Sequence, residues 1–183
     1  MIARRIGNQL KGEGSVTVLG INWNNSGLTE RMRSFEVTLK TEFPKVRIQS
    51  SYLDSRSEAQ AEQIAHEVLS NDGGPNAILA LTGTATSGVI RAIDDSSSNR
   101  KIFLVSCDQT YNGLNPLAQG KIDAVIAENT FVMGDAAAHL IMEAHSGGVL
   151  TKTIYVKPAL VTRDNMFSPE LHKSLTYDTR ALY

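Results

Sequence analysis

Apolar and polar positions follow two different rhythms along this chain, and these predict strands and helices in turn. Short, mostly apolar runs predict buried strands, whereas stretches with an apolar residue every three or four positions predict amphipathic helices. The predicted strands cover 16–21, 46–52, 77–81, 102–105 and 122–127, and the predicted helices cover 2–11, 28–43, 58–69, 84–93 and 131–144. A polar turn ending at Gly120 is expected before the last of these strands.

The order of these elements predicts an α/β fold with an open, mostly parallel sheet and helices on both faces. The segment 46–52 alternates apolar and polar residues, which indicates a strand nearer an edge of that sheet. Two further short apolar pieces, 154–156 and 159–161, flank Pro158. The tail from 164 to 183 is polar and mixed, and no firm structure is expected for it.

The composition fits an ordinary folded protein of one domain, or at most one and a half. The chain has 183 residues, of which 42% are apolar and 20% charged, with a formal net charge of −1. This balance argues against a nucleic-acid-binding arm or a polybasic membrane patch. No apolar run approaches a membrane span, and Met1–Gly7 carries charge without the apolar stretch of a signal peptide.

Cysteine and histidine usage predicts neither a disulfide framework nor a metal site. Cys107 is the single cysteine, so an intrachain disulfide and a cysteine zinc site are excluded. The four histidines share no close ligand spacing; they are His66, His139, His145 and His172. We therefore expect no metal and no cofactor.

Candidate binding residues follow the ends of the predicted strands, because ligands of open parallel sheets bind at the carboxyl ends of the strands. These positions supply arginines, carboxylates, a hydroxyl and an indole. The candidates are Trp23, Arg31, Arg56, Thr82, Asp108 and Glu128. Carboxylates accept hydrogen bonds from sugar hydroxyls, arginines donate to them, and an aromatic ring can cover the apolar face of a sugar. The set suits a neutral polyhydroxylated ligand.

Each of four candidates also has a purely structural interpretation. Asp108 could close a loop through an Asx turn, and Arg31 could be a solvated helix residue. Trp23 could be a core or interface aromatic residue, and Glu128 could cap the helix that follows it.

Catalysis is not indicated, because the strand ends contain no nucleophile–base pair. The segment Gly83–Gly88 has the glycine spacing of a phosphate-binding loop but lacks the following Lys-Ser/Thr. The Ser87-Gly88 step lacks the preceding glycine of a nucleophile elbow. Packing of small residues explains this stretch, and Cys107 is expected to be a small core residue. No catalytic residue is predicted.

Five stretches occur in order along residues 3–166: Ser26–Phe35, Ala80–Ile93, Val105–Asp108, Gly120–Asn129 and Pro158–Asn165. Together they resemble the sugar-binding fold shared by ribose-type periplasmic binding proteins and LacI-type repressors. The resemblance implies sugar contacts at Arg31, Asp108 and Glu128, and more loosely at Thr82 and Arg56. The family usually has Asn in place of Thr82, Gln or Asn in place of Glu128, and an aromatic residue near Arg56.

The resemblance also implies a division of the chain. Residues 1–163 would form a sugar-binding lobe, in which 1–127 is the second lobe of the usual two. Within it, 130–147 would be the helix that normally packs on the first lobe, 150–163 the return through the hinge, and 164–183 a C-terminal tail. The first lobe and any helix-turn-helix would be absent. We therefore expect the apolar helix 131–144 to be buried against another chain, such as a homodimer partner, or to dock on its own lobe.

Four functions remain open from the sequence. The first is the sugar-binding part of a solute-binding protein, periplasmic or extracytoplasmic, that serves the membrane subunits of an ABC-type transporter. The second is the effector-binding domain of a cytoplasmic LacI-type regulator, which would reach DNA only through an absent N-terminal domain. An enzyme on a doubly wound sheet is a remote alternative, and the fourth is a fragment that binds nothing. The expected ligand is a monosaccharide or related polyol.

Overall fold

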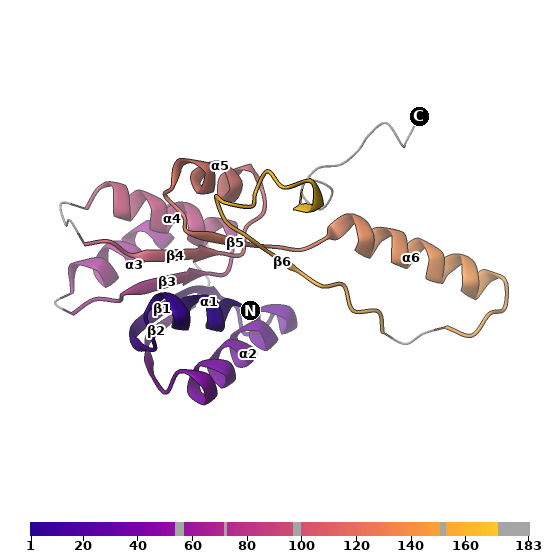
Figure 1. Cartoon of the computed structure of the whole chain (residues 1–183), viewed down its shortest axis with the longest axis horizontal. Helices are drawn as coiled ribbons and strands as arrows, with labels where there is room; N and C mark the ends of the chain where they lie inside the picture. Colours follow the sequence, from indigo (N-terminus) through magenta and orange to yellow (C-terminus); the bar gives the residue numbers. More distant parts are fainter. Residues whose placement is uncertain (54–56, 72, 97–99, 151–152, 172–183) are drawn as a thin grey trace.

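The structure is a computed structural model that describes residues 1–53, 57–71, 73–96, 100–150 and 153–171. Helices and strands alternate along most of the chain (Figure 1). In chain order the elements are α1 (Ile2–Gln9), β1 (Glu13–Ile21), α2 (Ser26–Glu42), β2 (Lys45–Leu53), α3 (Glu58–Ser70), β3 (Ala77–Ala80), α4 (Gly83–Asp94), β4 (Phe103–Ser106), α5 (Tyr111–Gln119), β5 (Ala124–Ala127), α6 (Thr130–His145) and β6 (Ala159–Val161).

The strands form one sheet in the order β2-β1-β3-β4-β5-β6. The first five strands in this order are parallel to their neighbours, and β6 runs antiparallel to β5, with Ala127 opposite Ala159. This arrangement confirms the predicted α/β class, and β2 occupies an edge as its alternating pattern indicated. Because strands with buried runs on both faces need cover on both sides, helices pack on each face of the sheet.

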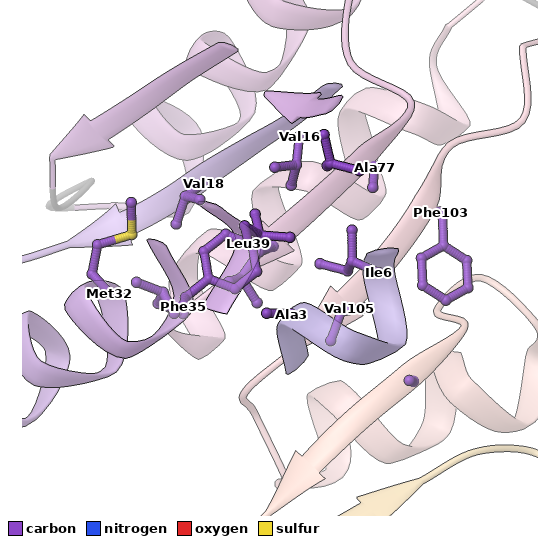
Figure 2. Close-up of a cluster of buried hydrophobic side chains, with 14 of the residues drawn as sticks. Ala3, Ile6, Val16, Val18, Met32, Phe35, Leu39, Ala77, Phe103 and Val105 are labelled. Atoms are coloured by element: carbon purple, nitrogen blue, oxygen red, sulfur yellow. The ribbon is translucent and has the colours of Figure 1, made fainter. Parts of the chain in front are cut away.

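Two hydrophobic clusters, one on each face, form the core. The first packs α1 and α2 against the sheet, and Figure 2 shows Ala3 and Ile6 of α1 among the side chains that meet there. The second packs α3, α4 and α5 on the opposite face. Met166 and Leu171, from the segment expected to lack firm structure, also pack on the second cluster.

Helices α3 and α4 touch almost backbone to backbone. A β-carbon added to Gly88 of α4 would lie 2.4 Å from the β-carbon of Ala61 in α3. Ala61 and Ala65 are fully buried in this contact region, as are Ala85 and Ala92. The segment Gly83–Gly88, which has the glycine spacing of a phosphate-binding loop, therefore serves to pack α4 closely against α3.

The prediction of a polar turn before Gly120 was wrong, because residues 111–119 form α5. Asn, Gly and Pro residues dominate this segment, and these residues usually mark turns. The helix is nevertheless favoured by burial, since Leu117 is completely buried and Leu114 packs beside it in the second cluster. Gly120 does end the element, with the left-handed φ of +78° that favours glycine at a helix terminus.

Helix α6 leaves the body of the molecule. The chain passes from β5 into α6 and returns to β6, so that the described residues 128–150 and 153–158 form an arm that extends away from the sheet (Figure 1). None of the residues of α6 is buried. The expectation that this helix docks on its own lobe was therefore wrong. The other alternative for this helix, burial against another chain, stays a prediction.

Exposed apolar side chains lie along the arm. Ile141 and Met142 are 70% and 69% exposed on α6, and Tyr155 is 92% exposed on the returning segment. Monomeric soluble proteins rarely leave so continuous an apolar surface open to water. Within the described residues, no helix combines the length and apolar character that crossing a membrane requires.

Candidate functional site

The described candidate residues lie at one edge of the sheet, where the parallel strands end and five helices, α2 to α6, begin. Helices α2, α4, α5 and α6 each start within a few residues of the carboxyl end of a strand. The side chains of Asn25, Thr82 and Asn129 accept hydrogen bonds from backbone N–H groups in the first turns of α2, α4 and α6. The positive ends of these helix dipoles therefore face this edge and favour carboxylates and other acceptors there.

Arg31 and Glu128 meet at this edge in an ion pair. Arg31 lies in the second turn of α2, and Glu128 directly follows β5. A guanidinium Nη2–H of Arg31 donates to Oε1 of Glu128 over 2.5 Å. The two side chains are 29% and 47% exposed, so solvent screens the pair and it adds little to stability. Arg31 is thus not a merely solvated residue, and Asn129 rather than Glu128 caps α6.

Asp108 follows the end of β4 and is nearly buried, with 7% of its surface exposed. Its Oδ1 accepts from the N–H of Thr110, which is the Asx turn that the sequence allowed. Its own N–H donates to Oγ of Ser106, whose hydroxyl also bonds to the Thr86 hydroxyl. Oδ2 makes no hydrogen bond with the side chains that the structure describes, and a carboxylate oxygen in this position can accept from a ligand hydroxyl.

Gln109 joins the two carboxylate positions and was missed by the sequence analysis. Its side-chain carbonyl accepts the backbone N–H of Glu128. The ends of β4 and β5 are thereby tied together beside Asp108 and the Arg31–Glu128 pair. Its position could have indicated a role, since Gln109 also follows a predicted strand. A glutamine next to an aspartate, however, has no sequence pattern that distinguishes a site residue from a loop residue.

The other three candidates are Thr82, Trp23 and Arg56, and the structure relates only Thr82 directly to Asp108. Thr82 caps α4 through its hydroxyl, and a β-carbon at the adjacent Gly83 would lie 2.9 Å from Oδ2 of Asp108. Trp23 lies on the loop after β1, and it is 54% exposed, which excludes the core interpretation. None of its described contacts joins the indole to Arg31 or Asp108. Arg56 lies outside the described residues.

Two grooves adjoin Glu128 and Pro158. The first, of about 200 Å³, lies between the start of α1, α2 and these two residues, with Arg31 and Ser34 in its wall. The second, of about 370 Å³, lies between α6 and the returning segment. Apolar side chains line most of the second groove, including Met133, Leu140 and Ile154. The polar strand ends and the apolar arm therefore form one continuous surface.

Cys107 lies next to this centre but lacks the features of a reactive thiol. Its side chain packs against the first hydrophobic cluster. Burial raises the pKa of the Cys107 thiol to about 11, and the nearby Arg31 opposes this shift only in part. The thiol therefore stays protonated at neutral pH, when a thiolate would be needed for nucleophilic chemistry.

Alkylation of Cys107 by iodoacetamide is expected to report this burial. Below pH 9 the thiol is protonated in the folded and the unfolded chain; between pH 9 and 11 only the unfolded chain has lost the proton. The rate should rise with a midpoint near pH 11 in buffer and near pH 9 in concentrated urea. A folded chain that reacts as fast as the unfolded one at pH 9 would contradict this assignment.

Comparison with protein families matches residues 1–148 to the profile described as periplasmic binding protein domain. No curated protein sequence matches the chain. Among solved structures, a solute-binding protein of an ABC transporter from Agrobacterium vitis with bound D-fucose superposes with a TM-score of 0.85 at 20% identity. The match covers 95% of this chain and 60% of that one.

Two further structures are similar over the same part of the chain. A sugar-binding protein of a sugar ABC transporter from Bacillus halodurans is 26% identical, with a TM-score of 0.80 over 91% of this chain and 61% of that chain. A glucose-galactose binding protein from Geobacillus stearothermophilus is 18% identical, with a TM-score of 0.82 over 91% of this chain and 59% of that chain. The chain thus spans about 60% of the length of these structures.

Proposed function

Since this chain belongs to the periplasmic binding protein domain family, we propose that it is the sugar-binding lobe of a solute-binding protein that serves an ABC-type transporter. The observation that carries the proposal is the ion pair between Arg31 and Glu128, with the nearly buried Asp108 next in sequence to the Gln109 that bonds the Glu128 backbone. Such a set binds hydroxyls and offers no nucleophile–base pair for catalysis.

The geometry of the pair suits a neutral ligand with several hydroxyls. A guanidinium has five N–H donors and a carboxylate two oxygens, so Arg31 and Glu128 can bond a ligand while they hold each other. The positive charge of Arg31 is matched by Glu128, which disfavours an anionic ligand. Asp108 adds an acceptor at the base of the site, and the exposed indole of Trp23 can lie over the apolar face of a sugar ring.

Transport is favoured over the regulator alternative by the described roles of the similar structures. Two of the three are described as parts of ABC transporters, and the third as a glucose-galactose binding protein. By this analogy the protein acts outside the cytoplasm, where a solute-binding protein delivers its ligand to membrane subunits of a transporter.

Titration of the single tryptophan with sugars tests the proposal. Fluorescence of Trp23 should change saturably with one of D-fucose, D-glucose, D-galactose or D-arabinose, added to about 10 mM because one lobe forms only one wall of the site. Asp108→Ala and Arg31→Ala should each weaken the affinity by about 1.5–3 kcal/mol, as loss of a charge-assisted hydrogen bond predicts.

A matched control is Arg4→Ala, which removes an exposed arginine that pairs with Glu42 away from the site. It should leave the affinity unchanged. Affinity that is the same in the native chain, Asp108→Ala and Arg31→Ala would contradict the assignment of the site. A native chain that shows no change with any of these sugars would contradict sugar binding by this lobe alone.

We propose further that a second lobe covers the arm, and that it lies outside these 183 residues or on another chain. The similar structures are longer by about two-fifths of their own length, which is room for such a lobe. The apolar groove of the arm is continuous with Glu128, so a lobe seated there would also form the opposite wall of the sugar site. A homodimer through residues 131–144 is the competing occupant.

Hydrogen exchange and light scattering distinguish these occupants. Isolated helices of this length are marginal in water, so in a monomeric chain the amides of α6 should exchange far faster than those of β1 and β3. A monomer with α6 strongly protected would contradict the need for any cover. A dimer that Ile141→Glu dissociates, and that the matched Val37→Glu on the exposed side of α2 does not, would favour the homodimer over the second lobe.

A further inference from the structure

Three side chains with metal-ligating atoms converge on the face of the molecule formed by α3 and α4, away from the sugar site. Glu62 and His66 stand one turn apart on α3, and Asp95 directly follows α4. One ligand atom from each of the three lies within 4.8 Å of the other two. Sequence spacing could not show this group, because a third ligand from another helix completes the pair on α3.

The helix contact beneath these residues fixes their spacing. Ala61 and Ala65 precede Glu62 and His66, and both are completely buried against α4. Gly88 allows the two helices to approach to the limit of backbone contact. Ligands mounted on closely packed helices keep their geometry better than ligands on loops. Ligand atoms around one tetrahedral ion are about 3.4 Å apart, so separations of up to 4.8 Å would close by about 1.5 Å or less, through rotations of the half-buried Glu62 and His66 and the exposed Asp95.

The charges around the group match a divalent cation. Arg91 of α4 is a cation that contacts this group, and its Nη2 lies 2.7 Å from Glu58 but its Nη1 lies 3.7 Å from Glu62. Glu58 therefore holds the guanidinium more closely than Glu62 does. Three carboxylates against one guanidinium leave two negative charges at the surface, and a shallow hollow of about 410 Å³ beside Glu62 and His66 gives an ion access.

We propose that Glu62, His66 and Asp95 bind a divalent transition-metal ion of the zinc type. Imidazole nitrogen and carboxylate oxygen are both zinc ligands, and water would complete the coordination of a three-ligand site. The ion joins α3 to the end of α4 and stabilises the face of the sheet that these helices cover. This site is independent of the sugar site, since no residue is shared.

Calorimetric titration of the whole chain with zinc chloride, after removal of metals by a chelator, tests the site. We expect one ion per chain, with affinity reduced about tenfold or more in each of Glu62→Gln, His66→Ala and Asp95→Asn. Zinc should also raise the melting temperature of the native chain and not that of His66→Ala. Asp95→Asn is the conservative variant at an exposed position, so its loss of affinity cannot be assigned to misfolding.

The matched control is His139→Ala. His139 stands 3.6 Å from Asp135 on α6 with the same one-turn spacing, but no third ligand of the described residues accompanies that pair. Zinc affinity should be unchanged in this variant. Equal affinity in the native chain and His66→Ala, loss of binding in His139→Ala, or no binding by the native chain at millimolar zinc would each overturn the proposal.

Discussion

Replacement of Gly113 by alanine is expected to destabilise the protein by about 3 kcal/mol or more, which is above the usual cost of overpacking. A β-carbon at this position would lie 1.8 Å from the backbone oxygen of Asp108, so the first turn of α5 would have to move. Because Asp108 moves with it, sugar affinity should fall together with stability. Urea unfolding followed by circular dichroism measures the first effect, and the Trp23 titration the second.

Gly134→Ala is the matched control, because it makes the same chemical change where the added carbon meets no described atom within 4 Å apart from its own stretch of helix. Gly134 lies within α6, where alanine favours the helix by about 0.5–1 kcal/mol over glycine. Stability should be unchanged or slightly raised. A Gly113→Ala variant as stable as Gly134→Ala would show that the Asp108 loop accommodates the added carbon, against the close packing described here.

Leu79→Ala is expected to cost about 2–5 kcal/mol of unfolding free energy. Leu79 is completely buried in β3, between β1 and β4, where a lost side chain leaves a cavity that the paired strands cannot close. Urea unfolding followed by circular dichroism measures this loss in the Leu79→Ala variant. Leu150→Ala removes the same atoms from a side chain that is 47% exposed on the arm, and it should cost less than about 1 kcal/mol. Similar losses in both variants would argue against β3 as the centre of the core.

Local pattern was enough to predict the sheet and most helices, because four of the five predicted strands in the parallel sheet are short apolar runs, the fifth alternates, and each predicted helix has one apolar stripe. It failed at α5, where Asn112, Gly113 and Pro116 favour a turn by local preference and the burial of Leu117 favours a helix. That burial depends on α4 and β5, which are distant in the sequence. Local pattern also gave no sign that Met166 and Leu171 of the polar tail pack on the second cluster, and residues 172–183 of that tail lie outside the described residues.

The candidate site was predictable as a set of positions and not as a set of contacts. The rule that ligands meet the carboxyl ends of parallel strands placed Arg31, Asp108 and Glu128 at one edge. It could not show that Arg31 and Glu128 pair with each other, or that Gln109 holds the backbone of Glu128. Those contacts depend on the register of β4 and β5, which the chain sets through long-range packing. The sugar-binding roles of these residues stay predictions until they are measured.

The pairing of Ala127 with Ala159 has a topological consequence. Strands β5 and β6 are antiparallel neighbours, so the arm is an oversized connection of a β-hairpin. A turn of two residues such as Asn-Gly is long enough to join two such strands directly. The entropy of closing a connection grows only slowly with its length, so the arm can be shortened, lengthened or exchanged at little cost to the sheet. The arm is in this sense an insertion between two paired strands, and we expect a chain that lacks 128–158 to keep the sheet and its five covering helices and to serve as a scaffold for other loops.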